Sequence, residues 1–172
     1  MKVPTAAQLI EHLRLEPLTF EGGYFRQTYV APESAAAEAL PAHYGSPRSF
    51  GSAIYYLLTS EAGSFSALHR LKTDEIYHFY LGDPVEMLLL HPDKRGERIV
   101  LGPDVLGGQH VQFVVPRGVW QGSRLVYGGS CALMGSTMAP GFDIADWTEG
   151  SRDALVREYP EHLELIRALT RQ

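Results

Sequence analysis

Two short motifs in the middle of the chain contain residue types that can do chemistry. The first holds a histidine and a carboxylate at fixed intervals between two glycines: Gly63, His69, Glu75 and Gly82. The second holds a proline, a glycine and an amide: Pro116, Gly118 and Gln121. Imidazole and carboxylate groups bind transition metals and also transfer protons. We therefore take His69, Glu75 and Gln121 as the candidate site.

The alternation of side chains along a strand predicts which neighbours accompany these residues. Successive side chains point to opposite faces, so an inward His69 also turns Leu71 inward. On the next strand, an inward Glu75 brings Tyr77 inward and turns His78 outward. Alternation therefore places Leu71 on the same face as His69, and His78 on the face opposite to Glu75.

Both motifs resemble the sequence motifs of the cupin superfamily. The first cupin motif is a glycine, five residues, His-x-His, three or four residues, a glutamate, six residues and a glycine; here Leu71 replaces the second histidine. The second is Pro-x-Gly-x2-His, and here Gln121 replaces its histidine. The resemblance implies the antiparallel double-stranded β-helix of the RmlC-like jelly rolls, with a small-molecule site inside the barrel. Together with strand alternation, it predicts that His69, Glu75 and Gln121 converge in one barrel cavity, with Leu71 on its wall and His78 outside it.

Further blocks resemble one cupin subfamily, the DUF985 or Cupin_5 group, which is defined as a domain of unknown function. These blocks run along most of the chain: Glu21–Phe25, Ile54–Leu58, His69–Glu75, His78–Gly82 and Ala139–Asp143. The resemblance implies a dimer but no reaction, because a fold alone does not specify chemistry. We interpret residues 1–172 as one cupin domain whose barrel core spans about residues 49–140.

The residues at the cupin metal positions predict a poor metal site. Metal-binding cupins typically use three histidines and one glutamate, a set that suits Fe, Mn, Ni or Zn. Here His69 and Glu75 are good ligands and Gln121 is a weak one, while Leu71 cannot coordinate a metal. We therefore favour no cofactor, with a divalent transition metal as the alternative. That alternative would make the protein a metal-dependent oxygenase or isomerase.

A metal-free branch of the cupins, the deoxysugar-nucleotide epimerases, suggests a second use of His69. Those enzymes pair an inward histidine with an aspartate as the base and use a tyrosine as the acid. By analogy, His69 is the base and Tyr77 the acid. Asp143 or Asp146 is the acidic partner, unless both aspartates only cap a turn. A purely structural reading is that His69 and Glu75 satisfy neighbouring buried polar groups.

Residues outside the acid–base set are candidates for substrate contacts: Arg26, Gln112, Trp120 and Gln121. Arg26 and Gln112 are polar residues in strand-like segments, where they can face a cavity. Trp120 can form the apolar wall for a ring-shaped ligand, although packing in the core explains it equally well. Arg48 is either an anion clamp or an ordinary surface charge.

The segments that would position these residues are predicted to be strands. Short runs of β-branched, aromatic and aliphatic residues alternate with turns rich in glycine, proline and aspartate, at residues 53–58, 75–81, 85–90, 111–115 and 131–138. No helix-length pattern interrupts them, which predicts an all-β antiparallel barrel. Short helices are predicted near both ends of the chain, after Thr5, Ser151 and Pro160.

Composition narrows the classes of partner. The net charge is −5, and no basic run indicates a nucleic-acid surface. No apolar run reaches the roughly 20 residues that a membrane helix needs. Cys131 is the single cysteine, so no intramolecular disulfide is expected, and no signal peptide is recognisable. We expect a cytoplasmic protein.

These observations favour a cupin that binds a small polar metabolite, such as a sugar or nucleotide-sugar, with metal-independent isomerase or epimerase chemistry. A non-catalytic ligand-binding protein is a further alternative. We also expect a homodimer, because several aromatic residues would form a large exposed surface: Tyr24, Phe25, Tyr29, His78 and Tyr80. The competing interpretation is that the terminal helices cover this surface within a monomer.

Overall fold

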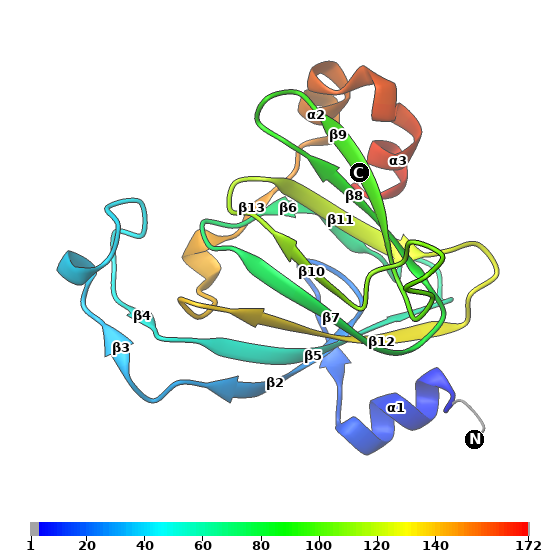
Figure 1. The fold of residues 1–172 in the computed structure, drawn as a ribbon, viewed down its shortest axis with the longest axis horizontal. Coiled ribbons are helices and arrows are strands. Elements are labelled where there is room, and N and C mark those ends of the chain that lie inside the picture. Colours follow the sequence, from blue (N-terminus) through cyan, green and yellow to red (C-terminus); the bar gives the residue numbers. More distant parts are fainter. Residues whose placement is uncertain (1–3, 172) are drawn as a thin grey trace.

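The computed structural model describes residues 4–171, most of which belong to two antiparallel sheets (Figure 1). The first sheet has six strands, in the spatial order β1 (Glu16–Pro17), β2 (Tyr24–Val30), β5 (Ser52–Thr59), β12 (Cys131–Met138), β7 (Glu75–Gly82) and β10 (Gln112–Val115). The second has five, in the order β13 (Thr148–Glu149), β6 (Ser66–Arg70), β11 (Trp120–Leu125), β8 (Val85–Leu90) and β9 (Gly96–Leu101). The predicted all-β jelly roll is confirmed.

The two sheets enclose an apolar core because their strands alternate as predicted. On β7, Glu75, Tyr77 and Phe79 are buried, whereas Tyr80 is exposed. Buried residues of both sheets meet in one cluster, which includes Tyr56, Tyr77 and Met134 from the first sheet and Met87 and Leu89 from the second. Each such side chain contributes about 1.5–3 kcal/mol by leaving water.

Three α-helices cover the outer faces of the sheets: α1 (Ala6–Leu13), α2 (Arg152–Glu158) and α3 (Leu163–Ala168). The predicted capping box is present, since Thr5 and Gln8 each cap the other's backbone N–H at the start of α1. Leu9 of α1 packs on Leu57 of the first sheet. Helices α2 and α3 lie against the second sheet, where their apolar residues pack with Leu88 and Leu90 of β8 (Figure 1). That contact explains why β8 is apolar on both faces.

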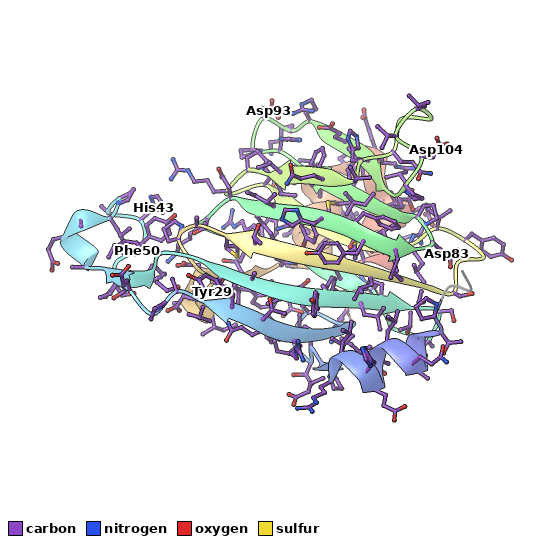
Figure 2. All side chains as sticks on the ribbon, turned by 60° about the horizontal axis from the view of Figure 1, so that its bottom comes forward. Tyr29, His43, Phe50, Asp83, Asp93 and Asp104 are labelled. Carbon is purple, nitrogen blue, oxygen red and sulfur yellow. The ribbon has the colours of Figure 1, made fainter. Side chains whose placement is uncertain are left out.

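A short ribbon, residues 34–49, extends from the barrel and is called the arm here (Figure 1). It contains β3 (Ser34–Ala35) paired with β4 (Arg48–Ser49), and a 3-10 turn at Ala37–Ala39. Further 3-10 turns lie at Ile144–Asp146 and Pro160–His162. Tyr29, His43 and Phe50 gather at the same end of the molecule (Figure 2).

The aromatic surface expected from the sequence is only partly present. Tyr29 and Tyr80 are exposed, and His78 lies on the outer face as predicted. The expectation that Phe25 belongs to this surface is wrong, because Phe25 packs against the barrel core and lines a cavity instead of facing outward. Tyr24 packs in the cluster that α1 covers. No helix within residues 4–171 is long and apolar enough to cross a membrane.

Candidate functional site

A cavity of about 390 Å³ opens into the barrel between the start of the chain and the inner face of the first sheet. Its walls are mainly apolar and aromatic, with residues such as Leu18, Phe20, Phe25, Ile54, Phe142 and Trp147. Leu71 also lines it, in the position expected from strand alternation. The polar lining includes three carboxylates, Glu16, Glu21 and Glu75, and the hydroxyl of Ser136. An enclosed, largely apolar space with a few polar groups is typical of a small-molecule site.

Glu75, the first residue of β7, is held by two hydrogen bonds, one from the second sheet and one from the adjacent strand β12. The amide Nε2 of Gln121 on β11 donates to its Oε2 at 2.7 Å, and the hydroxyl of Ser136 on β12 donates to its Oε1. Burial raises the pKa of Glu75 above the usual value, and the nearby Glu21 carboxylate raises it further. His69 and the two hydrogen bonds oppose this rise in pKa.

His69 lies on β6, next to Gln121 on β11, and its side chain is 1% exposed. Its Nδ1 is 2.7 Å from the carbonyl oxygen of Ala67. A carbonyl can only accept, so Nδ1 donates this bond and Nε2 is the ring nitrogen left for other partners. Nε2 lies 3.9 Å from Oε2 of Glu21 and 4.0 Å from Oε2 of Glu75. The histidine therefore faces two carboxylates without bonding directly to either.

Glu21 was not identified as a site residue from the sequence, although it begins one of the cupin-like blocks. Its Oε1 accepts a 2.6 Å hydrogen bond from the hydroxyl of Ser66. The loop that carries it lies close against the barrel at Gly22, where an added Cβ would be 2.1 Å from the carbonyl oxygen of Phe65. Gly22 has φ +115°, and its carbonyl accepts a hydrogen bond from Tyr56. In the sequence, the glycine pair Gly22 and Gly23 was the feature that could have indicated a tight turn beside Glu21.

Trp147, rather than Trp120, forms the aromatic wall of the cavity. Its ring lies nearly parallel to the imidazole of His69, with centroids 6.1 Å apart and planes at 23°. Phe20 meets it edge-on at 5.2 Å. The prediction that Trp120 forms a ligand wall is wrong. Trp120 packs on the cluster beneath α2 and α3, with the guanidinium of Arg70 4.6 Å from the centre of its ring.

Two buried polar atoms at the site have no hydrogen-bond partner within residues 4–171. One is the donor Nε1 of Trp147 and the other is the acceptor Oε1 of Gln121. A buried polar atom without a partner is costly. A ligand or water that reaches Trp147 with an acceptor oxygen would remove part of this cost.

The remaining acid–base candidates do not join the site. The prediction that Asp143 is the acidic partner of His69 is wrong. Its carboxylate accepts a hydrogen bond from the backbone N–H of Ala145 at 2.8 Å and caps the turn. Asp146 instead forms a buried ion pair with Arg48, at 2.6 and 2.7 Å. Arg48 is therefore neither a free clamp nor a surface charge. The carboxylates that face His69 are Glu21 and Glu75.

Three other predicted site residues point elsewhere. Tyr77 is buried in the core and does not line the cavity; burial, with Glu75 nearby, raises its pKa well above the usual value, which makes it a poor acid. Gln112 is exposed on the outer face, with its Nε2 3.2 Å from Nδ1 of His78. Arg26 borders the cavity, but its guanidinium lies over the ring of Tyr55, 5.6 Å from the centroid.

The candidate metal ligands converge but do not fit a metal ion in their present positions. With bonds of about 2.1 Å, the separations of 3.9 and 4.0 Å would require N–metal–O angles of about 140°, which match neither tetrahedral nor octahedral geometry. The amide hydrogens of Gln121 point to Glu75, and Leu71 offers no ligand atom. Within residues 4–171, no three His, Cys, Asp or Glu residues are grouped to hold a metal.

Similarity to known proteins agrees with this architecture. Residues 7–149 match the family described as "Cupin superfamily (DUF985)". The chain is 31% identical to "Uncharacterized protein YML079W" of Saccharomyces cerevisiae over 150 residues, which cover 82% of this chain and 70% of the yeast protein. It is also similar to protein SO0799 from Shewanella oneidensis, with 31% identity and a TM-score of 0.84 over 99% of both chains.

Two further solved structures share the fold. A hypothetical protein from Leishmania major is 28% identical, with a TM-score of 0.86 over 98% of this chain and 100% of that one. Oxalate decarboxylase from Bacillus subtilis is 15% identical, with a TM-score of 0.51 over 87% of this chain and 35% of the enzyme, a likeness of fold alone. The chain, with both cupin motifs meeting inside one jelly-roll barrel, belongs to the cupin superfamily, in the DUF985 family.

Proposed function

We propose that this protein binds a small, uncharged, hydroxyl-bearing molecule in the barrel cavity and moves a proton on it without a metal. The chemistry would be that of an isomerase or epimerase. The observation that carries the proposal is the position of His69 Nε2, 3.9 and 4.0 Å from two carboxylates that both line the cavity. Neither carboxylate is close enough to the imidazole for a direct hydrogen bond.

The spacing of these groups suits an oxygen atom better than a metal. A hydroxyl oxygen about 2.8 Å from Nε2 and about 2.8 Å from a carboxylate oxygen spans such a separation at about 90°. It can come from the ligand or from a water molecule. Glu75, with its raised pKa, holds a proton more readily than an ordinary glutamate. A carboxyl with a raised pKa beside an imidazole is an arrangement that acid–base catalysis uses.

The lining favours a neutral ligand. Glu16, Glu21 and Glu75 all border the cavity, whereas the guanidinium of Arg26 is turned towards Tyr55. The phosphates of a nucleotide-sugar would meet these carboxylates without a facing cation. A sugar ring, by contrast, can pack its apolar face on aromatic walls and offer hydroxyls to carboxylates. We therefore propose a free sugar or a similar polyhydroxylated metabolite as the ligand class.

One observation supports a non-catalytic binding protein as the second candidate. His69 is 1% exposed and is not itself part of the cavity lining. In this case Glu21 and Glu75 would only hold ligand hydroxyls.

A thermal-shift screen tests the ligand class. The panel contains neutral sugars and polyols, sugar phosphates, nucleotide-sugars and organic acids, with Phe142→Ala as the cavity variant. Phe142 lines the cavity, whereas the control Phe50→Ala removes an exposed phenylalanine outside it. A neutral sugar at a hundredfold excess over its dissociation constant should add about 2.7 kcal/mol to wild-type stability. The effect should shrink in Phe142→Ala only. Stabilisation by anionic compounds alone, lost in Phe142→Ala, would contradict the proposal.

A further inference from the structure

A second depression, of about 450 Å³, lies beside the cavity and has the opposite charge. Leu71 lines both spaces. The second depression, called the basic pocket here, is lined by four basic residues: His43, Arg70, Lys72 and Arg117. Such a concentration contrasts with the net charge of −5 for the whole chain.

The basic pocket is assembled from segments far apart in the sequence. His43 comes from the arm, Arg70 from the end of β6 and Thr148 from β13. The loops that carry Lys72 and Arg117 are fixed to each other, because the N–H of Gly118 donates to the carbonyl of Leu71 at 2.8 Å. The fold, and not a local run of basic residues, therefore brings these charges together.

The positive charge of the basic pocket is only partly cancelled within its lining. The one carboxylate there, Asp146, is fully buried and already receives two hydrogen bonds from Arg48. Lys72 lies 3.6 Å from Asp146, but 41% of its side chain is exposed. Arg70 and Arg117 are also exposed, with the guanidinium of Arg70 over the ring of Trp120 and Nη1 of Arg117 3.1 Å from Nδ1 of His43. Exposed cations held close together repel each other, and a bound anion removes that repulsion.

We propose that the basic pocket is a binding site for a small oxyanion, of which a phosphate group is the best match. Guanidinium groups bind phosphate through paired, charge-assisted hydrogen bonds, and an ammonium group adds a point charge. Arg117 and Lys72 provide these two kinds of donor, with the hydroxyl of Thr148 beside them. This inference goes beyond the chemistry of the cavity and does not depend on it.

Titration with inorganic phosphate, followed by backbone amide NMR, tests the proposal at low ionic strength. Acetate is the carboxylate comparison, and sodium chloride controls for ionic strength. The test variants are Lys72→Gln and Arg117→Gln, at exposed or half-buried positions. The control variant is Arg98→Gln, an exposed arginine on β9. β9 is the opposite edge of the second sheet from β13 and β6, which border the basic pocket.

We expect saturable shifts at Lys72, Gly118 and Thr148, with phosphate binding more tightly than acetate. Each test variant should weaken phosphate binding at least about tenfold, since one charge-assisted hydrogen bond is worth that much. Arg98→Gln should bind as the wild type does. Shifts centred on other residues, no saturation, or equal weakening in the control would overturn the site. Neutral-sugar binding in the cavity should persist in both test variants, so the two proposals can fail separately.

Discussion

At the scale of single residues, the site couples three groups that can hold a proton. The Nδ1 hydrogen of His69 is committed to the carbonyl of Ala67, so the proposed proton transfer would go through Nε2. Glu75 is buried next to a second carboxylate, Glu21, and both effects raise its pKa. A proton on Glu75 is therefore favoured by its surroundings. The hydrogen bonds from Gln121 and Ser136 limit this preference without cancelling it.

The raised pKa of Glu75 predicts how stability depends on pH. A raised pKa means that the folded state binds this proton more tightly than the unfolded chain does. Stability is then highest below the ordinary glutamate pKa and falls as pH rises through the folded pKa. Glu75→Gln lacks this titration. As pH rises, the unfolding free energy of Glu75→Gln should therefore increase relative to that of the wild type. The total change is about 1.4 kcal/mol for each pH unit between the pKa of Glu75 in the folded state and its pKa in the unfolded chain.

Denaturant unfolding between about pH 4 and about pH 8 measures this difference. The control is Glu86→Gln, which removes a carboxylate that is paired with Arg124 at 3.1 Å and lies outside the site. A difference for Glu75→Gln that stays constant, or moves in favour of the wild type with rising pH, is incompatible with the raised pKa.

The metal prediction also belongs to single residues. Protein purified without an affinity tag should contain far less than one equivalent of Fe, Mn, Ni or Zn, because Leu71 and Gln121 replace two histidine ligands. Leu71→His combined with Gln121→His should bind Zn²⁺ at least about tenfold more tightly, as each added imidazole is a strong ligand. Elemental analysis and metal titration measure both. Near one equivalent of metal in the wild type, lost in His69→Ala, would refute the prediction.

Residues in regular strands could be predicted, and those in loops could not. The convergence of His69, Glu75 and Gln121 follows from motif spacing and from the alternation of side chains along strands. Glu21 and Trp147 lie in loop segments, where no periodicity predicts direction. Trp120 was misplaced because α2 and α3 cover the outer face of the second sheet, so a large side chain on the outer face of β11 is half-buried there.

At the scale of elements, the turn before β2 decides whether Glu21 reaches the cavity. Gly22 adopts φ +115° and lies against the backbone of Phe65. A side chain there meets both backbone strain and a steric clash. The same turn receives the hydroxyl of Tyr56 and leads into β2, which lines the cavity through Phe25.

Gly22→Ala should therefore destabilise the protein more than an alanine substitution at a positive-φ glycine with free space around it. Gly128→Ala is the matched control, because Gly128 also has positive φ, +87°, but an added Cβ would meet nothing within 4 Å. Strain at such a position costs about 1–3 kcal/mol, and only Gly22→Ala adds the clash. Thermal unfolding compares the two variants. Equal losses of stability would show that the Gly22 turn does not need its close approach to the barrel.

The strands themselves could be predicted wherever their composition was distinctive. The expected segments 85–90 and 131–138 coincide with β8 and β12. β9 and β11 are less distinctive because they contain glycine and charged residues, such as Gly96, Arg98 and Gly122. The arm could not be predicted, since its two-residue strands depend on pairing with each other rather than on composition.

At the scale of the whole molecule, we propose that two copies associate. Tyr29 and Phe50 are each 55% exposed near the arm, and Tyr80 is 50% exposed on the outer face of the first sheet. α1 covers a different part of that face, around Leu57 and Tyr24, so it does not replace a partner there. A two-fold axis buries such a surface on both copies at once.

Light scattering at micromolar concentration should give the mass of two chains. Tyr80→Glu places a charge in the proposed interface and should shift the equilibrium towards one chain. Tyr127→Glu is the control, as Tyr127 is fully exposed in the turn after β11. A mass of one chain that does not change with concentration would contradict the dimer.

The central claim, that the cavity moves a proton on a bound molecule, is tested most directly by solvent deuterium exchange. The neutral sugar that stabilises the protein most is incubated in D2O with the wild type and with Glu75→Gln, and carbon-bound deuterium is measured by mass spectrometry. The wild type should introduce deuterium at one carbon. Glu75→Gln should bind the sugar but exchange at least about a hundredfold more slowly, the loss expected for an acid–base group. A sugar that binds in the cavity and gains no carbon-bound deuterium would show a binding protein instead of an enzyme.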